Sequence, residues 1–327
     1  MMRSTPRVSV ITPAYNVARY IGQAIESVQA QTLTDWEMII VDDASPDETV
    51  QVVRRYLDDP RIQLLQNEQN MGAGYTRNRA LDVAQGEWIA ILDADDQYAP
   101  ERLEKLWRLA QEKEAFVFSD LHLIIDDEGK NYRLMVDDTG KKYKVSFPPH
   151  LKLPREPTRY TVREYIFHHI PIKPFANREY IQRHHIRYLE DVVTGQDFIF
   201  QVQLLLHGSD LWILPEPNYF YRVQPESITR RLGSQLELRN FLFDRLRELE
   251  GIRDNPELVR CVEVARRRFL LPIRYRRFVE SIRNRQWCTS WQYFSADVAA
   301  MFIKRLPGAI YRRLHARERL KEPREGT

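Results

Sequence analysis

The feature that most constrains the fold is an alternation, in the first 120 residues, of short apolar runs with amphipathic segments. The apolar runs have the length and β-branched content of buried strands, and the segments between them have the apolar spacing of helices. Such an alternation predicts an α/β fold with a mostly parallel sheet flanked by helices. The expected strands cover residues 8–12, 36–41, 62–66, 88–92 and 115–125, and the expected helices cover 17–31, 47–57, 74–84 and 100–112.

Local signals continue this pattern through the second third of the chain. Ser45, followed by Pro46 and Glu48, has the residue order of a capped helix start, and Thr161 with Glu164 has that of a capping box. The polar, proline-bearing segment 129–160 predicts a long loop or irregular insertion. Further helices are expected from residue 161, from residue 177, over 194–206 and from residue 235 onward, with a strand at 219–223.

The composition is that of a folded protein rather than of a disordered or fibrous chain. Hydrophobic residues make up 43% and charged residues 29% of the 327 residues, both ordinary for a globular protein. The two cysteines, Cys261 and Cys288, are too few for a disulfide framework or a cysteine-ligated zinc site. We find no signal-peptide pattern and no run of about 18 apolar residues, so we expect a cytoplasmic chain that does not itself cross a membrane.

Carboxylates gather where the second and fourth expected strands end. Asp42 and Asp43 follow the second strand, and Asp93, Asp95 and Asp96 follow the fourth. In an open α/β sheet, ligands bind beyond the carboxyl ends of the strands. Clustered carboxylates favour a hard divalent cation, Mg²⁺ or Mn²⁺, that also binds substrate phosphates. The alternative, that single acids cap helices or form turns, stays open for Asp43 and Asp96.

Four motifs at these positions resemble one known family. They are VSVITPAYN at 8–16, IIVDDAS at 39–45, NMG at 70–72 with RN at 77–78, and ILDADD at 91–96. In this order and spacing they resemble the family 2 glycosyltransferases of the GT-A fold, with the likeness running over about residues 7–225. The resemblance implies an inverting transferase that uses a nucleotide-diphosphate sugar and a divalent cation.

The resemblance also implies roles for individual residues. It places Asp95 as the metal ligand and Asp42 as the acceptor of the nucleobase N–H, while Arg222 is a possible further contact to the diphosphate. An aromatic ring for stacking and a carboxylate for the imide N–H favour uracil over a purine. The implied nucleotide-binding residues are Pro13, Ala14, Tyr15, Asp42, Arg77 and Asp93.

Inversion requires a base that deprotonates the acceptor hydroxyl. The family supplies it from a Glu-Asp pair, and here Asp197 stands in the Asp position with Gln196 in place of the Glu. Asp197 is the predicted base, and Asp191 is the second choice. Gln224 stands where relatives carry a His, so we expect no metal ligand there. The adjacent histidine pairs, 168–169 and 184–185, point in different directions on a helix and make poor joint ligands.

The carboxyl-terminal part of the chain is strongly basic. From Arg239 to Thr327 there are 21 Lys and Arg against 11 Asp and Glu, a net charge of +10, whereas the rest of the chain carries −7. Arginines interleaved with aromatic residues are typical of a helix that lies on an anionic membrane surface. A plain helical layer has the same composition, and so has a nucleic-acid-binding surface, although we expect no nucleic acid as partner.

These observations predict a GT-A domain over 1–232 and a basic, aromatic-rich helical extension over 233–327. The expected reaction moves a hexose from a UDP-sugar to a hydroxyl of a saccharide acceptor, lipid-linked in polysaccharide synthesis, with the enzyme peripheral on the inner face of the cell membrane. One alternative is a nucleotidyltransferase, although its glycine-rich phosphate loop is missing. Another is a non-catalytic nucleotide-sugar-binding protein, suggested by Gln196 and Gln224.

Overall fold

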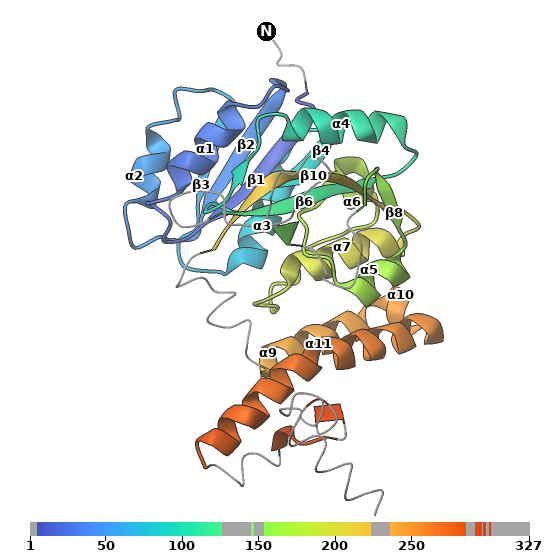
Figure 1. Cartoon of the computed structure of the whole chain (residues 1–327). Coiled ribbons are helices and arrows are strands. Elements are labelled where there is room, and N and C mark those ends of the chain that lie inside the picture. The colour runs from blue at the N-terminus through green and yellow to red at the C-terminus, as the bar shows by residue number, and fades with distance from the viewer. Residues whose placement is uncertain are drawn as a thin grey trace, which may run out of the picture.

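The structure, a computed structural model, describes residues 5–125, 145–146 (backbone only), 154–223, 236–285, 292–295, 297–298 and 301. Its centre is one mixed sheet in the strand order β3-β2-β1-β4-β9-β6-β10-β5, with β7 pairing with β6 and β8 pairing with β10 (Figure 1). The strands are β1 (Val8–Ala14), β2 (Trp36–Asp42), β3 (Ile62–Gln66), β4 (Trp88–Ile91), β5 (Gln97–Tyr98), β6 (Val117–Ile125), β7 (Val145–Ser146), β8 (Thr158–Tyr160), β9 (Phe175–Asn177) and β10 (Leu211–Arg222).

The sheet consists of two parallel regions joined by an antiparallel strand. The strands β3, β2, β1 and β4 run parallel, β9 is antiparallel to both β4 and β6, and β6 is parallel to β10. Ala14 pairs with Asp42, so the carboxyl ends of β1 and β2 lie level. This register confirms the expected mixed, mostly parallel α/β sheet, and it brings the loops after β1 and β2 to one edge.

Helices cover both faces of the sheet (Figure 1). Apolar side chains of α1, α2 and α4 pack on one face, and those of α3, α5, α6 and α7 pack on the other. The amphipathic spacing of these segments explains the two layers, because each helix buries one apolar stripe. The helices are α1 (Ile21–Gln29), α2 (Thr49–Arg54), α3 (Ala73–Val83), α4 (Arg102–Glu112), α5 (Val162–His168), α6 (Arg178–Arg183), α7 (Gln196–Leu206), α9 (Leu236–Glu248), α10 (Glu250–Arg253) and α11 (Pro256–Arg283).

Two of the predicted local signals have different outcomes. The capping box of Thr161 and Glu164 is present at the start of α5. The helix start predicted at Ser45 is wrong, because α2 begins at Thr49 and no side chain caps it. The segment 129–160, predicted as a loop, contains strands β7 and β8, and most of the remainder of that segment lies outside the described residues.

The carboxyl-terminal helices α9, α10 and α11 pack beneath α5 and α7 (Figure 1). Leu242, Ile252, Val262 and other apolar residues of these helices belong to the same buried cluster as the side chains of α7. The first part of the basic extension is therefore an added layer on the shared core, while the proposed boundary at 232–233 lies outside the described residues. Within the described segments, no helix is both long and apolar enough to cross a membrane.

Candidate active site

The predicted nucleobase residues lie at the level edge formed by β1 and β2. Asp42 is 1% exposed, and its Oδ2 accepts a hydrogen bond from the backbone N–H of Ser45 at 3.1 Å. Its Oδ1 has no partner among the described residues. Tyr15 directly follows β1 and is 47% exposed. The edge therefore offers a buried carboxylate acceptor and an exposed aromatic ring, and Pro13 and Ala14 are the last two residues of β1, directly before Tyr15.

The loop after β1 is held in place by the loop after β2. Ser45 Oγ accepts a hydrogen bond from the backbone N–H of Asn16 at 3.0 Å, and Asp47 Oδ2 accepts one from Ala18 at 2.9 Å. Asn16 has a positive φ of 54°, a conformation that asparagine tolerates better than most residues. Ser45, predicted to cap a helix, instead fixes the loop that carries Tyr15.

Asp43 organises the loop that leads into α3. Its Oδ1 accepts hydrogen bonds from Asn67 Nδ2 at 2.6 Å and from the N–H of Met71 at 2.8 Å, and its Oδ2 accepts one from Gly72 at 2.8 Å. Gly72 has a φ of +87°, which favours glycine at this position. Of the alternatives left open for Asp43, the structure therefore supports the turn-forming role.

The acidic loop after β4 brings three carboxylates together. One oxygen each of Asp93, Asp95 and Asp96 lies within 4.8 Å of the others. Asp96 accepts hydrogen bonds from Tyr219 Oη at 2.5 Å and from the backbone N–H of Arg222 at 2.8 Å. Arg222 Nε also donates to the backbone oxygen of Asp95 at 2.8 Å, so this buried arginine braces the acidic loop. Its contact with a diphosphate stays a prediction.

The crowding of these acids shifts their pKa values in opposite directions. Burial, together with the charge of Asp93, raises the pKa of Asp95 to about 6, and burial with the neighbouring carboxylates raises that of Asp96 well above its usual range. Burial acts to raise the pKa of Asp93 as well, but the charges of Lys173 and Arg77 outweigh it and lower that pKa. Crowded carboxylates whose charged forms are disfavoured fit a hard divalent cation, which would relieve the repulsion.

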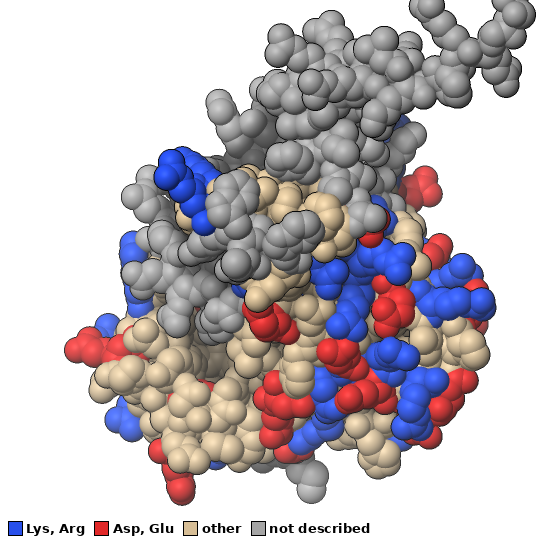
Figure 2. All heavy atoms as spheres, turned by 90° about the horizontal axis from the view of Figure 1, so that it is seen from below, with Lys and Arg blue, Asp and Glu red and all other residues tan. Residues whose placement is uncertain are grey.

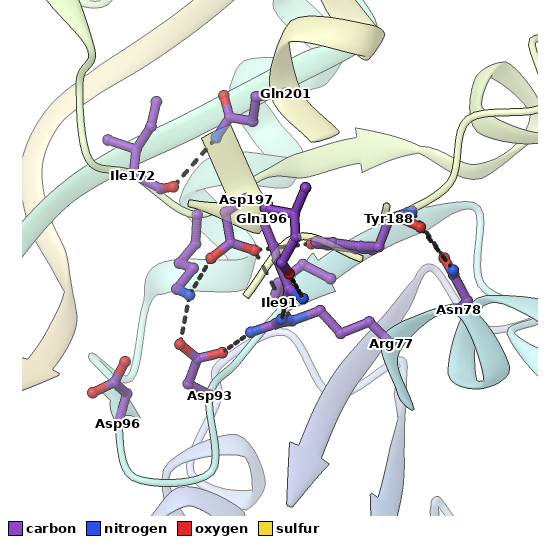
Figure 3. Close-up of polar contacts among 12 residues, drawn as sticks. Arg77, Asn78, Ile91, Asp93, Asp96, Ile172, Tyr188, Gln196, Asp197 and Gln201 are labelled. Carbon is purple, nitrogen blue, oxygen red and sulfur yellow. Dashed lines mark hydrogen bonds and ion pairs between the residues drawn. The ribbon is translucent and has the colours of Figure 1, made fainter. Parts of the chain in front are cut away.

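Behind the acidic loop, two cations hold two carboxylates together. Arg77 Nη2 donates to Asp93 Oδ1 at 2.7 Å, and Lys173 Nζ donates to Asp93 Oδ2 at 2.6 Å and to Asp197 Oδ2 at 2.5 Å. Asp197 lies in the first turn of α7. Figure 3 shows Arg77, Asp93 and Asp197 pointing toward one another from α3, the β4 loop and α7. The structure thus brings the predicted base to the predicted donor site.

The exposed fractions show which of these side chains are accessible from outside the protein. The side chains of Arg77 and Lys173 are 8% and 7% exposed, whereas those of Asp93 and Asp197 are 24% and 21% exposed. The cations therefore lie behind the carboxylates, and the carboxylates face the open side. The charges of Lys173 and Arg77 lower the pKa of Asp93 against the effect of its burial, so this carboxylate stays ionised.

A second set of contacts supports Asp197 from the segment before α7. Tyr188 Oη donates to Asp197 Oδ1 at 3.0 Å. Asn78 of α3 holds the backbone of Tyr188 from both sides, because its Nδ2 donates to the carbonyl at 3.0 Å and its Oδ1 accepts from the N–H at 2.9 Å. Sequence reasoning missed Lys173 and Tyr188, which belong to none of the recognised motifs, and it gave Asn78 no role.

The remaining predicted site residues have other surroundings. Gln196 Oε1 accepts a hydrogen bond from Arg77 Nη1 at 2.6 Å, so it steadies the arginine where relatives carry Glu. Asp191, the second choice for the base, is 50% exposed and pairs with Arg245 of α9 at 2.9 Å. Gln224 lies outside the described residues.

The carboxyl-terminal layer touches the start of α7 directly. A Cβ atom at Gly195, which has a φ of +80°, would lie 2.8 Å from Leu242 of α9. The ring of His169 lies 4.0 Å from that of Phe198 and 4.5 Å from that of Phe269 of α11, measured between centroids. Gly195, before Gln196 and Asp197, therefore lies against the carboxyl-terminal layer, and Phe198, after them, is linked to that layer through His169.

The sequence also matches a known family over more than half of its length. The model of glycosyl transferase family 2 matches residues 9–181. The chain belongs to glycosyltransferase family 2. One family relative is the succinoglycan biosynthesis protein ExoO of Rhizobium meliloti, which is 29% identical over 283 residues, 81% of this chain and 79% of that protein. The chain is thus a glycosyltransferase with relatives in polysaccharide synthesis.

Solved structures of other glycosyltransferases share this fold. Staphylococcus aureus TarS residues 1–349 in complex with UDP-GlcNAc matches with a TM-score of 0.62 at 21% identity, over 80% of this chain and 72% of that one. The mannosyltransferase PcManGT from Pyrobaculum calidifontis, in complex with GDP-Man and Mn²⁺, matches with a TM-score of 0.60 at 18% identity, over 96% and 83%. The family 2 chain therefore has the GT-A fold that its motifs predicted.

Proposed function

We propose that this family 2 enzyme transfers a hexose from a UDP-sugar to a hydroxyl of a saccharide acceptor, with inversion at the anomeric carbon. The observation that carries the proposal is that the ammonium group of Lys173 donates hydrogen bonds to both Asp197, the proposed base, and Asp93, at the proposed donor site. A base and a donor site must adjoin for a single in-line displacement.

The choice of a uridine nucleotide rests on the edge formed by β1 and β2. The Oδ1 atom of Asp42, without a partner among the described residues, accepts the imide N–H of uracil, and the exposed ring of Tyr15 stacks on the base. TarS, which shares the fold, was solved with UDP and with UDP-GlcNAc, while PcManGT was solved with GDP-Man. A guanine base is therefore the alternative to be tested.

The acidic loop suits a divalent cation, Mg²⁺ or Mn²⁺. We propose Asp95 as the residue that holds it, since one of its carboxylate oxygens lies within 4.8 Å of an oxygen of Asp93 and of Asp96, and burial together with the charge of Asp93 disfavours its charged form unless a cation is bound. When bound, the cation neutralises charge on the diphosphate leaving group. Arg77, buried beside Asp93, adds a fixed positive charge on the protein side of the donor.

In this proposal Asp197 accepts the proton of the attacking hydroxyl. A carboxylate offers about four acceptor sites, and Lys173 and Tyr188 occupy one on each oxygen of Asp197, so acceptor capacity remains on both. As the hydroxyl oxygen forms its bond to the anomeric carbon, the bond from that carbon to the diphosphate breaks and the proton passes to Asp197. The acceptor reaches Asp197 from the side on which its side chain is exposed to solvent.

The test is release of nucleoside diphosphate from a panel of donors: UDP-glucose, UDP-galactose, UDP-N-acetylglucosamine and GDP-mannose, with Mn²⁺ and with EDTA. We expect turnover with a UDP-sugar that EDTA and Asp95→Ala abolish. Asp197→Asn should reduce turnover by about 10²-fold or more, the usual contribution of a general base. Asp191→Asn is the matched control and should keep near wild-type activity. Release from GDP-mannose alone would refute the uridine assignment, and unchanged turnover by Asp197→Asn would refute the base.

We further propose that the acceptor is lipid-linked and that α11 rests on the anionic inner face of the membrane. Arg260, Arg267 and Arg274 are spaced seven residues apart on one side of α11 and have no ion-pair partner among the described residues, and Val264 between them is 52% exposed. The rest of the layer is partly neutralised, since Arg266, Arg277 and other arginines pair with acids. Figure 2 shows basic and acidic side chains interspersed on the lower face.

Sedimentation with phosphatidylglycerol vesicles tests this placement. The triple variant Arg260→Glu, Arg267→Glu and Arg274→Glu should lose binding, since each basic residue near an anionic surface contributes about 1 kcal/mol. Reversing Arg54, Arg55 and Arg108 on α2 and α4 is the control and should leave binding unchanged. Equal sedimentation of both variants would contradict the proposal. Deleting the extension is unsuitable as a test, because its helices share the core.

A further inference from the structure

A buried lysine lies at the centre of the site, and neither the motifs nor the proposed chemistry assigns it a role. Lys173 precedes β9 and is 6% exposed. Its ammonium group bridges the carboxylates of Asp93 and Asp197 at 2.6 and 2.5 Å. Ser119 Oγ of β6 donates to the backbone oxygen of Lys173 at 2.6 Å, so the residue is fixed to the sheet.

The ammonium group is a permanent cation. Burial acts to lower the pKa of Lys173, but the charges of Asp197 and Asp93 outweigh burial and raise it. A buried ammonium is costly unless it is paired and hydrogen-bonded, and here both carboxylates provide the pairing. The cost of burying a lysine at this point implies that the bridge contributes something an apolar side chain cannot.

The two carboxylates depend on this lysine to different degrees. Asp93 has a second cation, because Arg77 Nη2 donates to its other oxygen at 2.7 Å. For Asp197 the nearest arginine atom, Nε of Arg77, is 4.0 Å away, and its other donor is the neutral hydroxyl of Tyr188. Among the described residues, Lys173 is thus the one cation within hydrogen-bonding distance of Asp197. Loss of its charge affects the base more than the donor site.

We propose that Lys173 is a positioning residue that holds the Asp197 carboxylate at the donor site, so that the base faces the anomeric carbon. The inference rests on the proposed function, because it assigns Asp197 as the base. Lys173 contacts Asp197 from the protein interior: the lysine side chain is 7% exposed, whereas the side chain of Asp197 is 21% exposed. Tyr188 holds the other oxygen, so that the two donors together fix the plane of the carboxylate.

The experiment compares Lys173→Met, Lys173→Gln and Lys173→Arg in the donor assay with Mn²⁺. We measure kcat and KM for the UDP-sugar that the wild type turns over, and the affinity for UDP by calorimetry. Lys173→Met removes the charge at similar length, Lys173→Gln keeps a hydrogen-bond donor if the methionine variant fails to fold, and Lys173→Arg keeps the charge. Lys105→Met is the control, since Lys105 is also bridged by two carboxylates, Glu101 and Glu216, but on α4.

We expect Lys173→Met and Lys173→Gln to lower kcat by about 10²-fold, as loss of a positioned base does, with the donor KM and the UDP affinity within threefold of wild type. Lys173→Arg should recover at least tenfold of that loss, and Lys105→Met should leave kcat unchanged. A kcat near wild type in the folded methionine or glutamine variant would overturn the role of Lys173 alone. A fall in UDP affinity as large as the fall in kcat would also overturn it. A wild type that turns over no donor would overturn the proposed function and this inference together.

Discussion

Asn78 holds the backbone of Tyr188, whose hydroxyl donates to Asp197, the proposed base, and a nearly isosteric substitution tests the contribution of Asn78. In the structure, Asn78 Nδ2 donates to the Tyr188 carbonyl at 3.0 Å and to Glu190 Oε1 at 3.1 Å, and its Oδ1 accepts from the Tyr188 N–H at 2.9 Å. Asn78→Asp keeps the acceptor but replaces the donor with an oxygen. That oxygen then faces a carbonyl and a carboxylate.

The magnitude follows from these three contacts. A buried polar group left without its hydrogen bond costs about 1–3 kcal/mol, and Asn78 is only 5% exposed. Asn78→Asp leaves the Tyr188 carbonyl without a donor and buries a charge beside it, so we expect a loss of about 2–5 kcal/mol in the free energy of unfolding. Asn78→Ala loses the hydrogen bonds without adding the repulsion. The aspartate variant should therefore be at least as unstable as the alanine variant, although it resembles asparagine more closely.

Urea unfolding at pH 7.5, followed by circular dichroism, measures these differences. The matched control is Asn240→Asp on α9, where Oδ1 only accepts, from Nε and Nη2 of Arg266 at 3.2 and 2.9 Å. A carboxylate there serves the same arginine, so we expect no loss of stability. If the free energy of unfolding of Asn78→Asp lies within about 0.5 kcal/mol of wild type, well below the expected cost of about 2 kcal/mol, the contacts of Asn78 with the Tyr188 backbone do not stabilise the fold as argued.

Two further predictions concern pH and the nucleotide. Burial, helped by Arg239, lowers the pKa of His169 to about 3, so the native form stays neutral while the unfolded chain takes up a proton near pH 6.5. The free energy of unfolding should therefore fall as the pH decreases below 6.5, by at most about 1.4 kcal/mol per pH unit. His169→Asn, which tolerates the φ of 48°, should reduce that fall in urea titrations at pH 7.5 and 5.5, and an unchanged fall would contradict the assignment. Tyr15→Ala should weaken UDP binding by about 1–3 kcal/mol, the value of one base stack, while Tyr15→Phe should not; equal affinities of all three proteins in calorimetry would exclude stacking.

Local patterns predicted the elements well because each depends on a few neighbouring residues. The strands 36–41 and 62–66 match β2 and β3 closely, and the helices predicted over 74–84 and 100–112 match α3 and α4 to within two residues. Period and length carry this information within a single segment. The capped helix start at Ser45 failed because the hydroxyl found a partner elsewhere: it accepts from Asn16, 29 residues away in the chain.

The site was predictable only in part. Asp42, Asp93 and Asp197 could be named as candidates because they follow strands or open a helix within recognisable motifs, and the structure brings Asp93 and Asp197 together through Lys173. Lys173 and Tyr188 were missed, since a lysine before a short strand and a tyrosine in a loop carry no local signal.

By itself, the sequence determined the α/β class, the family resemblance, and the strand ends at which the carboxylates stand. Only the tertiary structure decided what surrounds each carboxylate: Asp43 holds a loop, Asp96 accepts from Tyr219, and Asp197 is held beside Asp93 by Lys173. It also showed that the first part of the basic extension packs on α7, the helix that carries Asp197. The physical reason is that hydrogen bonds and ion pairs act over about 3–4 Å in space, whereas partners such as Asp95 and Arg222 lie 127 residues apart along the chain.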